Sequence, residues 1–205
     1  LIGGAKVSSK LAVLDNLLHK VDKLIIGGGM ANTFLFAKGL GVGASLCQEE
    51  LANTAQDIMS NAQAAGCEIV LPVDVVLAKA FEAGADCATV PVEKVPDSMM
   101  ILDVGPASVR DLTVRLAGCR TLLWNGPMGA FEISPFDEGT VKVAQAAAAQ
   151  TKAGNLTSVA GGGDTVAALY HAGVADDFTY VSTAGGAFLE WLEGKILPGI
   201  KALEN

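Results

Sequence analysis

The sequence predicts an α/β domain in three αβα layers, with a mostly parallel sheet of about six strands between two layers of helices. Two observations predict this architecture. Short apolar runs that suit β-strands alternate with helical stretches throughout the chain, and glycine-rich turns follow several of those runs. Parallel strands need long crossovers, which are usually helices and cover both faces of the sheet. The 205 residues, 51% of them hydrophobic, suit one such domain with a substantial core.

Strands are expected where apolar, β-capable residues run between turn residues. The chain opens on what resembles the end of a strand, residues 1–4, without an initiating Met, so we expect it to begin inside a longer protein. The other strands are expected at residues 21–26, 68–71, 74–80, 99–102, 121–124, 156–160 and 177–181. Residues 88–92 are expected to form an edge strand in a small insertion, because Pro91 and Pro96 cannot donate ladder hydrogen bonds.

Helices are expected where apolar residues recur at intervals of three and four. Residues 5–20 show this spacing at Val7, Leu11, Leu14 and Leu18. The other helices are expected at residues 30–38, 48–65, 107–117, 137–153, 166–170 and 188–192. The order of elements is that of a Rossmann-like domain, in which ligands bind at the carboxyl ends of the strands.

The composition argues against several classes of partner. A formal net charge of -8 does not favour nucleic acid or an anionic membrane, and no apolar run is long enough to span a bilayer. The two histidines have no partner at metal-ligand spacing. Four widely spaced cysteines are expected to be buried free thiols, which suits the reducing cytoplasm. They are Cys47, Cys67, Cys87 and Cys119.

Residues 155–170 indicate an anionic ligand, because they read as a strand, a glycine turn and a helix. The three glycines at 161–163 let the backbone approach a phosphate, and the start of the helix presents free N–H groups. Asp164 follows directly and would repel a phosphate unless a cation such as Mg²⁺ lay between them. The alternative is that Asp164 and Thr165 only cap the helix.

Lys6 and Lys10 also indicate an anion. They lie one turn apart near the start of the helix expected at residues 5–20, so they would share a face. Positive charge at a helix N-terminus is unfavourable because of the helix dipole, and a bound anion would explain why two lysines lie there. Two solvated lysines remain the alternative.

Common phosphate-binding motifs do not explain these features. Residues 39–44, GLGVGA, match a dinucleotide fingerprint but follow a helix and precede none, so we expect a loop there. The only Gly-Lys pair, Gly194-Lys195, is followed by Ile196, which excludes a P-loop. The H-R-D and D-F-G elements of protein kinases are absent as well.

Six segments together resemble one family. They are GGAKVSSK at 3–10, IIGGGMANTF at 25–34, LDVGPAS at 102–108, WNGPMGAFE at 124–132, GGGDT at 161–165 and LEGKILPG at 192–199. In this order they resemble the C-terminal, nucleotide-binding half of phosphoglycerate kinase, and they cover the chain from end to end. The resemblance implies a glycolytic enzyme that transfers a phosphoryl group reversibly between 1,3-bisphosphoglycerate and ADP, giving 3-phosphoglycerate and ATP.

The resemblance also implies a role for individual residues. Those implied to contact the phosphates or the transferring phosphoryl group are Lys6, Lys10, Asn125, Gly162, Gly163, Thr165, Gly185 and Gly186. Those implied to surround the adenine and ribose are Gly28, Gly29, Leu102, Pro127 and Glu132, the last through the ribose hydroxyls. Asp164 is implied to hold the Mg²⁺ of MgADP or MgATP. Lys6, Lys10, Gly185 and Gly186 are the implied catalytic groups, and no protein nucleophile is needed.

Two departures from the family pattern qualify this reading. The last glycine turn, STAGGA at 182–187, has Ala184 where the family usually has glycine, and alanine fits only if φ is negative. The family holds 3-phosphoglycerate on an N-terminal half rich in arginine and histidine. The arginines here are dispersed, at Arg110, Arg115 and Arg120.

The N-terminal half is therefore expected to be absent. We expect residues 1–205 to be a single, monomeric nucleotide-binding domain that binds ADP or ATP and is inactive alone. Two alternatives are a stand-alone nucleotide-binding regulatory module and a dinucleotide-dependent oxidoreductase.

Overall fold

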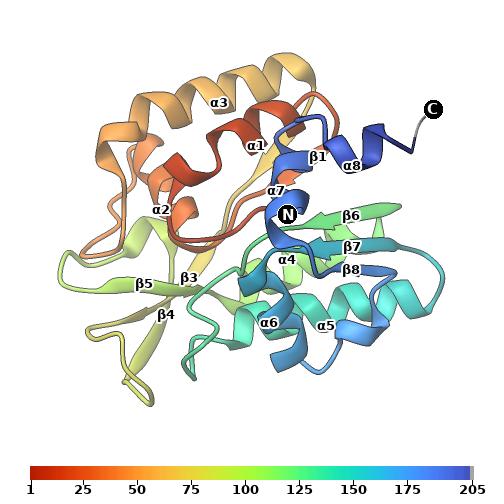
Figure 1. Ribbon diagram of the computed structural model, residues 1–205. Helices are drawn as coiled ribbons and strands as arrows, with labels where there is room; N and C mark the ends of the chain where they lie inside the picture. The colour runs from red at the N-terminus through yellow and green to blue at the C-terminus, as the bar shows by residue number, and fades with distance from the viewer. Residues whose placement is uncertain (204–205) are drawn as a thin grey trace.

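A parallel sheet forms the centre of the computed structural model, which describes residues 1–203. Its strands are β1 (Lys23–Ile25), β2 (Glu68–Val70), β6 (Thr121–Trp124), β7 (Thr157–Gly161) and β8 (Tyr180–Ser182). Residues 1–3 join β1 to β6, because Ile2 bridges in parallel to Ile26 on one side and to Asn125 on the other. The order β2-β1-(1–3)-β6-β7-β8 confirms the expected mostly parallel sheet of about six strands (Figure 1).

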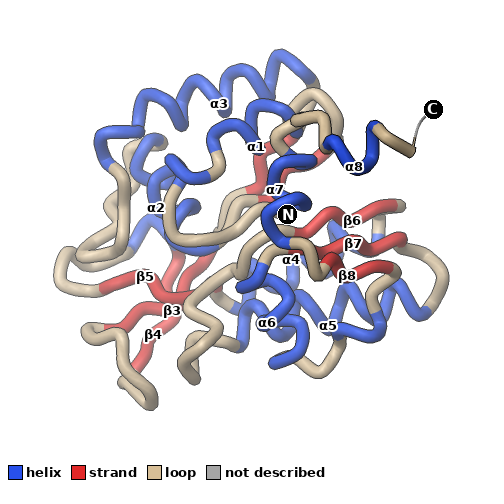
Figure 2. The backbone as a smooth tube through the Cα atoms, viewed as in Figure 1, coloured by secondary structure: helices blue, strands red, loops and turns tan. Residues whose placement is uncertain are grey.

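Helices cover both faces of this sheet, which confirms the three αβα layers (Figure 2). One layer contains α1 (Leu11–Leu17), α2 (Gly28–Ala37), α3 (Ala52–Ala65) and α7 (Gly185–Leu192). The other contains α4 (Pro106–Ala117), α5 (Glu138–Lys152) and α6 (Gly163–His171). Successive strand residues point to opposite faces. Leu24 and Ile26 accordingly pack with the helices of the first layer, whereas Ile25 packs with those of the second.

A second sheet lies beside the first and was not foreseen as a separate unit. It consists of β3 (Asp74–Ala78), β4 (Cys87–Pro91) and β5 (Met100–Val104), all antiparallel, with β4 at one edge as Pro91 predicts. The expectation that strands alternate with helices throughout is therefore wrong here. The connections within residues 79–99 carry only a short 3₁₀ turn, η3 (Val92–Lys94), and such connections join antiparallel neighbours.

The expected helix at residues 5–20 is also wrong at its start. Residues 7–9 form a separate 3₁₀ turn, η1 (Val7–Ser9), and α1 begins only at Leu11. Lys6 is extended, with φ -133° and ψ 130°, and Lys10 has φ -128° and ψ 4°. The two lysines therefore do not share a helix face. Val7 is fully buried, and a β-branched residue followed by two serines favours α-helix only weakly, so a 3₁₀ turn that still buries Val7 takes the place of the first helical turn.

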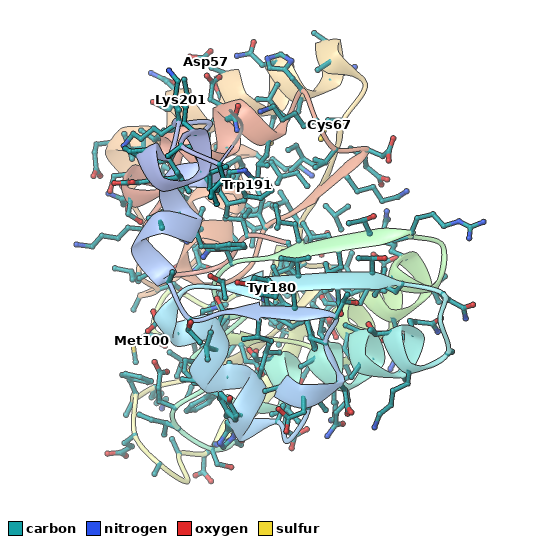
Figure 3. All side chains as sticks on the ribbon, turned by 45° about the vertical axis from the view of Figure 1, so that its right-hand side comes forward. Asp57, Cys67, Met100, Tyr180, Trp191 and Lys201 are labelled. Carbon is teal, nitrogen blue, oxygen red and sulfur yellow. The ribbon has the colours of Figure 1, made fainter. Side chains whose placement is uncertain are left out.

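Smaller elements complete the chain. They are η2 (Glu49–Leu51) before α3, η4 (Ala175–Asp177) before β8, and α8 (Pro198–Lys201) after α7. Figure 3 shows Tyr180 on the edge strand β8 and Trp191 on α7, and both side chains are exposed. All four cysteines are free, as expected, but only Cys67 is fully buried and Cys87 is exposed. No helix within residues 1–203 is both long enough and apolar enough to cross a membrane.

Candidate functional site

A cavity of about 370 Å³ lies where the parallel sheet meets the antiparallel sheet. Six of the residues named from the sequence line it: Gly28, Gly29, Leu102, Pro127, Glu132 and Asp164. The polar end of the cavity is formed by three segments that lie far apart in the chain, namely the start of α2, the turn after β6 and the first turn of α6. The carboxyl ends of parallel strands are where ligands bind in open α/β sheets, and the cavity lies at that edge.

The glycines at the start of α2 let main-chain segments touch. Gly28 has φ +65°, and a Cβ there would lie 2.7 Å from the Gly4 carbonyl oxygen. A Cβ on Gly29 would lie equally close to the Ala5 carbonyl oxygen, at 2.7 Å. The Gly28 N–H donates to the carbonyl oxygen of Met128 at 2.8 Å. These glycines therefore hold the turn before α2 against two other segments as well as lining the cavity.

Lys10, Asn125 and Gly161 form a continuous hydrogen-bonded chain at the sheet edge. The Lys10 ammonium donates to Asn125 Oδ1, and Asn125 Nδ2 donates to the Gly161 carbonyl oxygen at 2.7 Å. Asn125 is buried, so both ends of its amide are used inside the protein. These two hydrogen bonds hold Lys10 against the glycine turn after β7. Burial lowers the pKa of Lys10, and the nearby Asp164 carboxylate opposes that shift.

Thr165 and Gly162 tie the turn after β6 to the start of α6. Thr165 is buried, and its hydroxyl accepts the Gly126 N–H at 2.6 Å. Gly162 has φ +98°, and a Cβ there would lie 2.6 Å from Asn125 Nδ2. The hydroxyl of Thr165 thus joins the two turns from a buried position.

Asp164 and Lys6 are the more open charged groups. Asp164 is exposed in the first turn of α6. The N-cap residue of this helix is Gly162, and no side chain makes a capping hydrogen bond there, so the capping alternative has no hydrogen bond to support it. Lys6 is exposed just before η1. Within residues 1–203, no three or more His, Cys, Asp or Glu residues gather that could hold a metal ion. A metal at Asp164 would therefore need further ligands from a bound phosphate.

The start of α7 adjoins the start of α6. A Cβ on Gly185 would lie 3.6 Å from Gly162 Cα and from the Gly163 nitrogen, so two helix N-termini lie next to each other here. Gly186 is exposed beside them. Ala184 has φ -99°, which an alanine adopts without strain, so the departure from the glycine pattern leaves this turn intact.

Sequence reasoning missed the side chains of the opposite wall. Phe81 is 54% exposed and Leu46 51% exposed, and both line the cavity, as does Met100 on β5, which Figure 3 shows far from Trp191. No motif marks them, because they come from a loop, a hairpin connection and an antiparallel strand. An unusual apolar exposure is their only signal, and it appears only once the fold is known.

Asp103 is the other missed residue. It lines the cavity but is only 2% exposed. Its carboxylate accepts hydrogen bonds from the N–H of Gly139 at 2.6 Å and from the N–H of Val104 at 2.8 Å. Burial raises the pKa of Asp103 to about 7, against the effect of those two hydrogen bonds. A carboxylate directly after the apolar run at 99–102 was the available signal in the sequence.

Comparison with known proteins places this geometry in a family. The family model of phosphoglycerate kinase matches residues 1–195. A phosphoglycerate kinase of Methylobacterium radiotolerans is 64% identical over 203 residues, which are 99% of this chain and 51% of that protein. A phosphoglycerate kinase of Dinoroseobacter shibae is also 64% identical, over 99% of this chain and 52% of its own length.

Solved structures agree with the sequence comparison. Phosphoglycerate kinase from Coxiella burnetii matches with a TM-score of 0.94 and 47% identity, over 99% of this chain and 51% of that one. The enzyme from Pyrococcus horikoshii matches with a TM-score of 0.80 and 29% identity, over 99% of this chain and 50% of that one. The chain thus spans about half the length of the relatives it matches. On sequence and fold together, it belongs to the phosphoglycerate kinase family.

Proposed function

We propose that this chain supplies the MgADP/MgATP site of an enzyme that transfers a phosphoryl group reversibly between 1,3-bisphosphoglycerate and ADP. The observation that carries the proposal is the convergence of Lys10, Asn125 and the glycine turns after β6 and β7 at one sheet edge, beside a largely apolar cavity. Such a site offers positive charge and N–H groups at one end and an apolar slot at the other, which matches a nucleotide.

The proposed contacts follow the polarity of the site. The residues proposed to contact phosphate are Lys6, Lys10, Asn125, Gly162, Gly163 and Thr165. The residues proposed to surround the base are Gly28, Gly29, Leu102 and Pro127, with Glu132 at the ribose hydroxyls. Gly185 and Gly186, at the adjoining start of α7, are proposed to offer amides to the phosphoryl group in transfer.

Catalysis by these residues would be electrostatic. Phosphoryl transfer depends on positioning and on neutralising charge at the equatorial oxygens rather than on a protein nucleophile. Lys10 is partly buried and held by Asn125, so its charge is placed before the ligand arrives and acts in a less polar setting than water. The N-termini of α6 and α7 add partial positive charge from two directions.

Asp164 is the proposed magnesium ligand. It is exposed, lines the cavity and lies near Lys10, so a phosphate bound there would meet one carboxylate and one ammonium. Mg²⁺ is commonly held by one or two carboxylates together with substrate phosphates, and when bound it would neutralise the phosphate charge that Asp164 otherwise repels. The single carboxylate fits that pattern.

The acceptor site is proposed to lie in a half that this chain does not contain. Proximity and orientation are worth about 7–11 kcal/mol of barrier, and that contribution is lost when one substrate has no site. Closure of two halves would also exclude water from the phosphoryl group. The chain alone should therefore bind nucleotide without turnover.

The four free cysteines support a place in the reducing cytoplasm. A monomeric state is carried over from the resemblance and can be checked by sedimentation.

Calorimetry on this chain tests the nucleotide site. MgADP should bind and NAD should not, because the one match to the dinucleotide pattern, at residues 39–44, does not follow a strand. Equal affinity for both, or no binding of MgADP, would remove the proposal. A coupled assay with ATP and 3-phosphoglycerate tests the second claim. Turnover near the 1–100 s⁻¹ typical of kinases would show that the acceptor also binds within these residues.

A further inference from the structure

The 3₁₀ turn η1, which lies between Lys6 and Lys10, is held by the side chain of a residue far away in the sequence. Gln48 Oε1 accepts the Ser8 N–H at 2.9 Å, and Gln48 Nε2 donates to the Ser8 hydroxyl at 2.9 Å. Within the part of the chain that the structure describes, Gln48 is the only sequence-distant residue whose side chain hydrogen-bonds this turn. The turn that carries the two lysines therefore has one specific polar tether.

The main chain of Gln48 is itself fixed beside the cavity. Its N–H donates to the hydroxyl of Thr33 on α2 at 3.0 Å, and Thr33 is buried. α2 begins at Gly28 in the cavity wall, and Leu46, two residues before Gln48, lines the same cavity. The glutamine side chain thus extends from a fixed point at the cavity to η1.

The turn η1 has little means of holding its own direction. A 3₁₀ turn of three residues has few internal hydrogen bonds, and its sequence, Val-Ser-Ser, favours helix only weakly. Val7 is buried and fixes where the turn lies, but Ser8 and Ser9 are exposed. Two hydrogen bonds from one side chain to Ser8 fix the orientation of the turn as well as its position.

The two lysines depend on η1 to different degrees. Lys10 has an anchor of its own, because its ammonium donates to the buried Asn125. Lys6 is exposed, and within residues 1–203 its ammonium makes no hydrogen bond or ion pair. Its main chain leads directly into η1, and Ala5 before it lines the cavity. The direction of Lys6 at the rim of the cavity is therefore set by η1.

We propose that Gln48 is a positioning residue, which holds η1 through Ser8 and thereby directs the Lys6 ammonium toward the phosphates of the nucleotide. This inference rests on the proposed nucleotide site and adds to it a residue that contacts no ligand. Ordering a mobile segment on binding costs affinity. A turn that is already fixed therefore leaves more of the attraction between lysine and phosphate for binding.

A double-mutant cycle on MgADP affinity, measured by calorimetry, tests the proposal. Gln48→Met keeps the length of the side chain and removes both hydrogen bonds, and it should weaken binding about threefold to tenfold, the net worth of an ordinary hydrogen bond. Lys6→Met should weaken binding at least as much. The double variant should bind as weakly as Lys6→Met alone, within about twofold, because Gln48 acts through Lys6.

Two further measurements distinguish positioning from a general loosening of the loop. Adenosine has no phosphate, so by competition with MgADP it should bind the wild type and Gln48→Met equally, within about twofold. Gln56→Met is the matched control, because Gln56 Nε2 donates to the Ala37 carbonyl oxygen at 2.8 Å, at the other end of α2 from the cavity. It should leave MgADP affinity unchanged. If Gln48→Met does not fold, Ser8→Ala, which removes one of the two hydrogen bonds, takes its place in the cycle.

The outcomes separate this proposal from the nucleotide site itself. Losses that add in the double variant, or an unchanged MgADP affinity in either single variant, overturn the role of Gln48. An equal loss of adenosine affinity, or an equal loss in Gln56→Met, overturns it too. In each of these cases the nucleotide site stands, because the wild type still binds MgADP. Absence of MgADP binding by the wild type removes the site on which the inference rests.

Discussion

The two walls of the cavity are built in different ways. At the carboxyl edge of the parallel sheet, main-chain segments meet directly, as Gly28 meets Gly4 and Gly126 meets Gly3. Across the cavity, side chains of the antiparallel sheet and its hairpin, such as Val75 and Phe81, form the surface. A wall built from backbone tolerates almost no substitution, whereas one built from side chains needs only apolar volume. The first kind leaves a glycine motif in the sequence and the second leaves none.

Gly126→Ala should have the largest effect, because it strikes the backbone-built wall. Gly126 has φ +100°, and a Cβ there would overlap the carbonyl group of Gly3. Its N–H and its carbonyl oxygen are both hydrogen-bonded, to Thr165 and Trp124, so the turn cannot move aside. We expect the free energy of unfolding to fall by more than about 3 kcal/mol, through left-handed strain of about 1–2 kcal/mol plus the overlap.

Gly154→Ala is the control for strain alone. Gly154 has φ +74° but no atom within 4 Å of the added Cβ. Urea unfolding should give a loss of about 1–2 kcal/mol for it. Equal losses in the two variants would show that main-chain contact does not set the wall apart.

Asp103→Asn should have the next largest effect, here on the pH dependence of the free energy of unfolding. Asp103 lies in the other wall, on β5. Burial raises the folded pKa of Asp103 to about 7, whereas an unfolded aspartate titrates near 3.9. The folded state therefore binds the proton more tightly. The stability that this provides is fully present below about pH 4, declines as pH rises and is lost above about pH 7. The decline can reach at most about 4 kcal/mol over those three pH units.

The measurement is the free energy of unfolding from pH 4 to 8 for both proteins. The wild type should lose stability with rising pH more steeply than Asp103→Asn, in which position 103 cannot ionise. The carboxylates of Asp137 and Glu138 add to the effect through their charge. Parallel pH profiles would show that Asp103 does not titrate in this range.

Asp164→Ala separates a metal ligand from a helix residue. As a metal ligand, Asp164 should matter for MgADP, whose affinity we expect to fall at least about tenfold, while the affinity for metal-free ADP is unchanged or rises. As an acidic residue in the first turn of α6 it contributes only about 0.3–1 kcal/mol of stability. Asp176→Ala removes another exposed first-turn carboxylate, outside the cavity lining, and should leave both affinities alone. Equal losses for ADP with and without magnesium would contradict the metal role.

The contrast between the walls explains how much the sequence revealed. The layers, the parallel sheet and the glycine turns were predictable because alternation and glycine placement are local signals. The antiparallel sheet was missed as a unit, since three short strands without helices between them carry no sign of which sheet they join. Asp103 was missed as a site residue because burial, and not residue type, makes it unusual. The prediction that Lys6 and Lys10 share a helix face was wrong because residues 7–9 form a 3₁₀ turn, and Val7 followed by two serines favours α-helix only weakly.

Ala184→Gly should have the smallest effect, and it tests whether a family motif is always a backbone requirement. Ala184 has φ -99° and ψ 67°, its side chain is exposed, and its carbonyl oxygen accepts the Phe188 N–H at 2.9 Å. Glycine there would relieve no strain and would only make the unfolded chain more flexible, at a cost of about 0.4–1 kcal/mol. MgADP affinity should change less than about twofold, because the N–H groups at 185 and 186 are present in both proteins. A tenfold gain in affinity would instead mean that position 184 adopts positive φ when nucleotide binds. The turn before α7 would then belong with Gly126 among the places where only glycine fits.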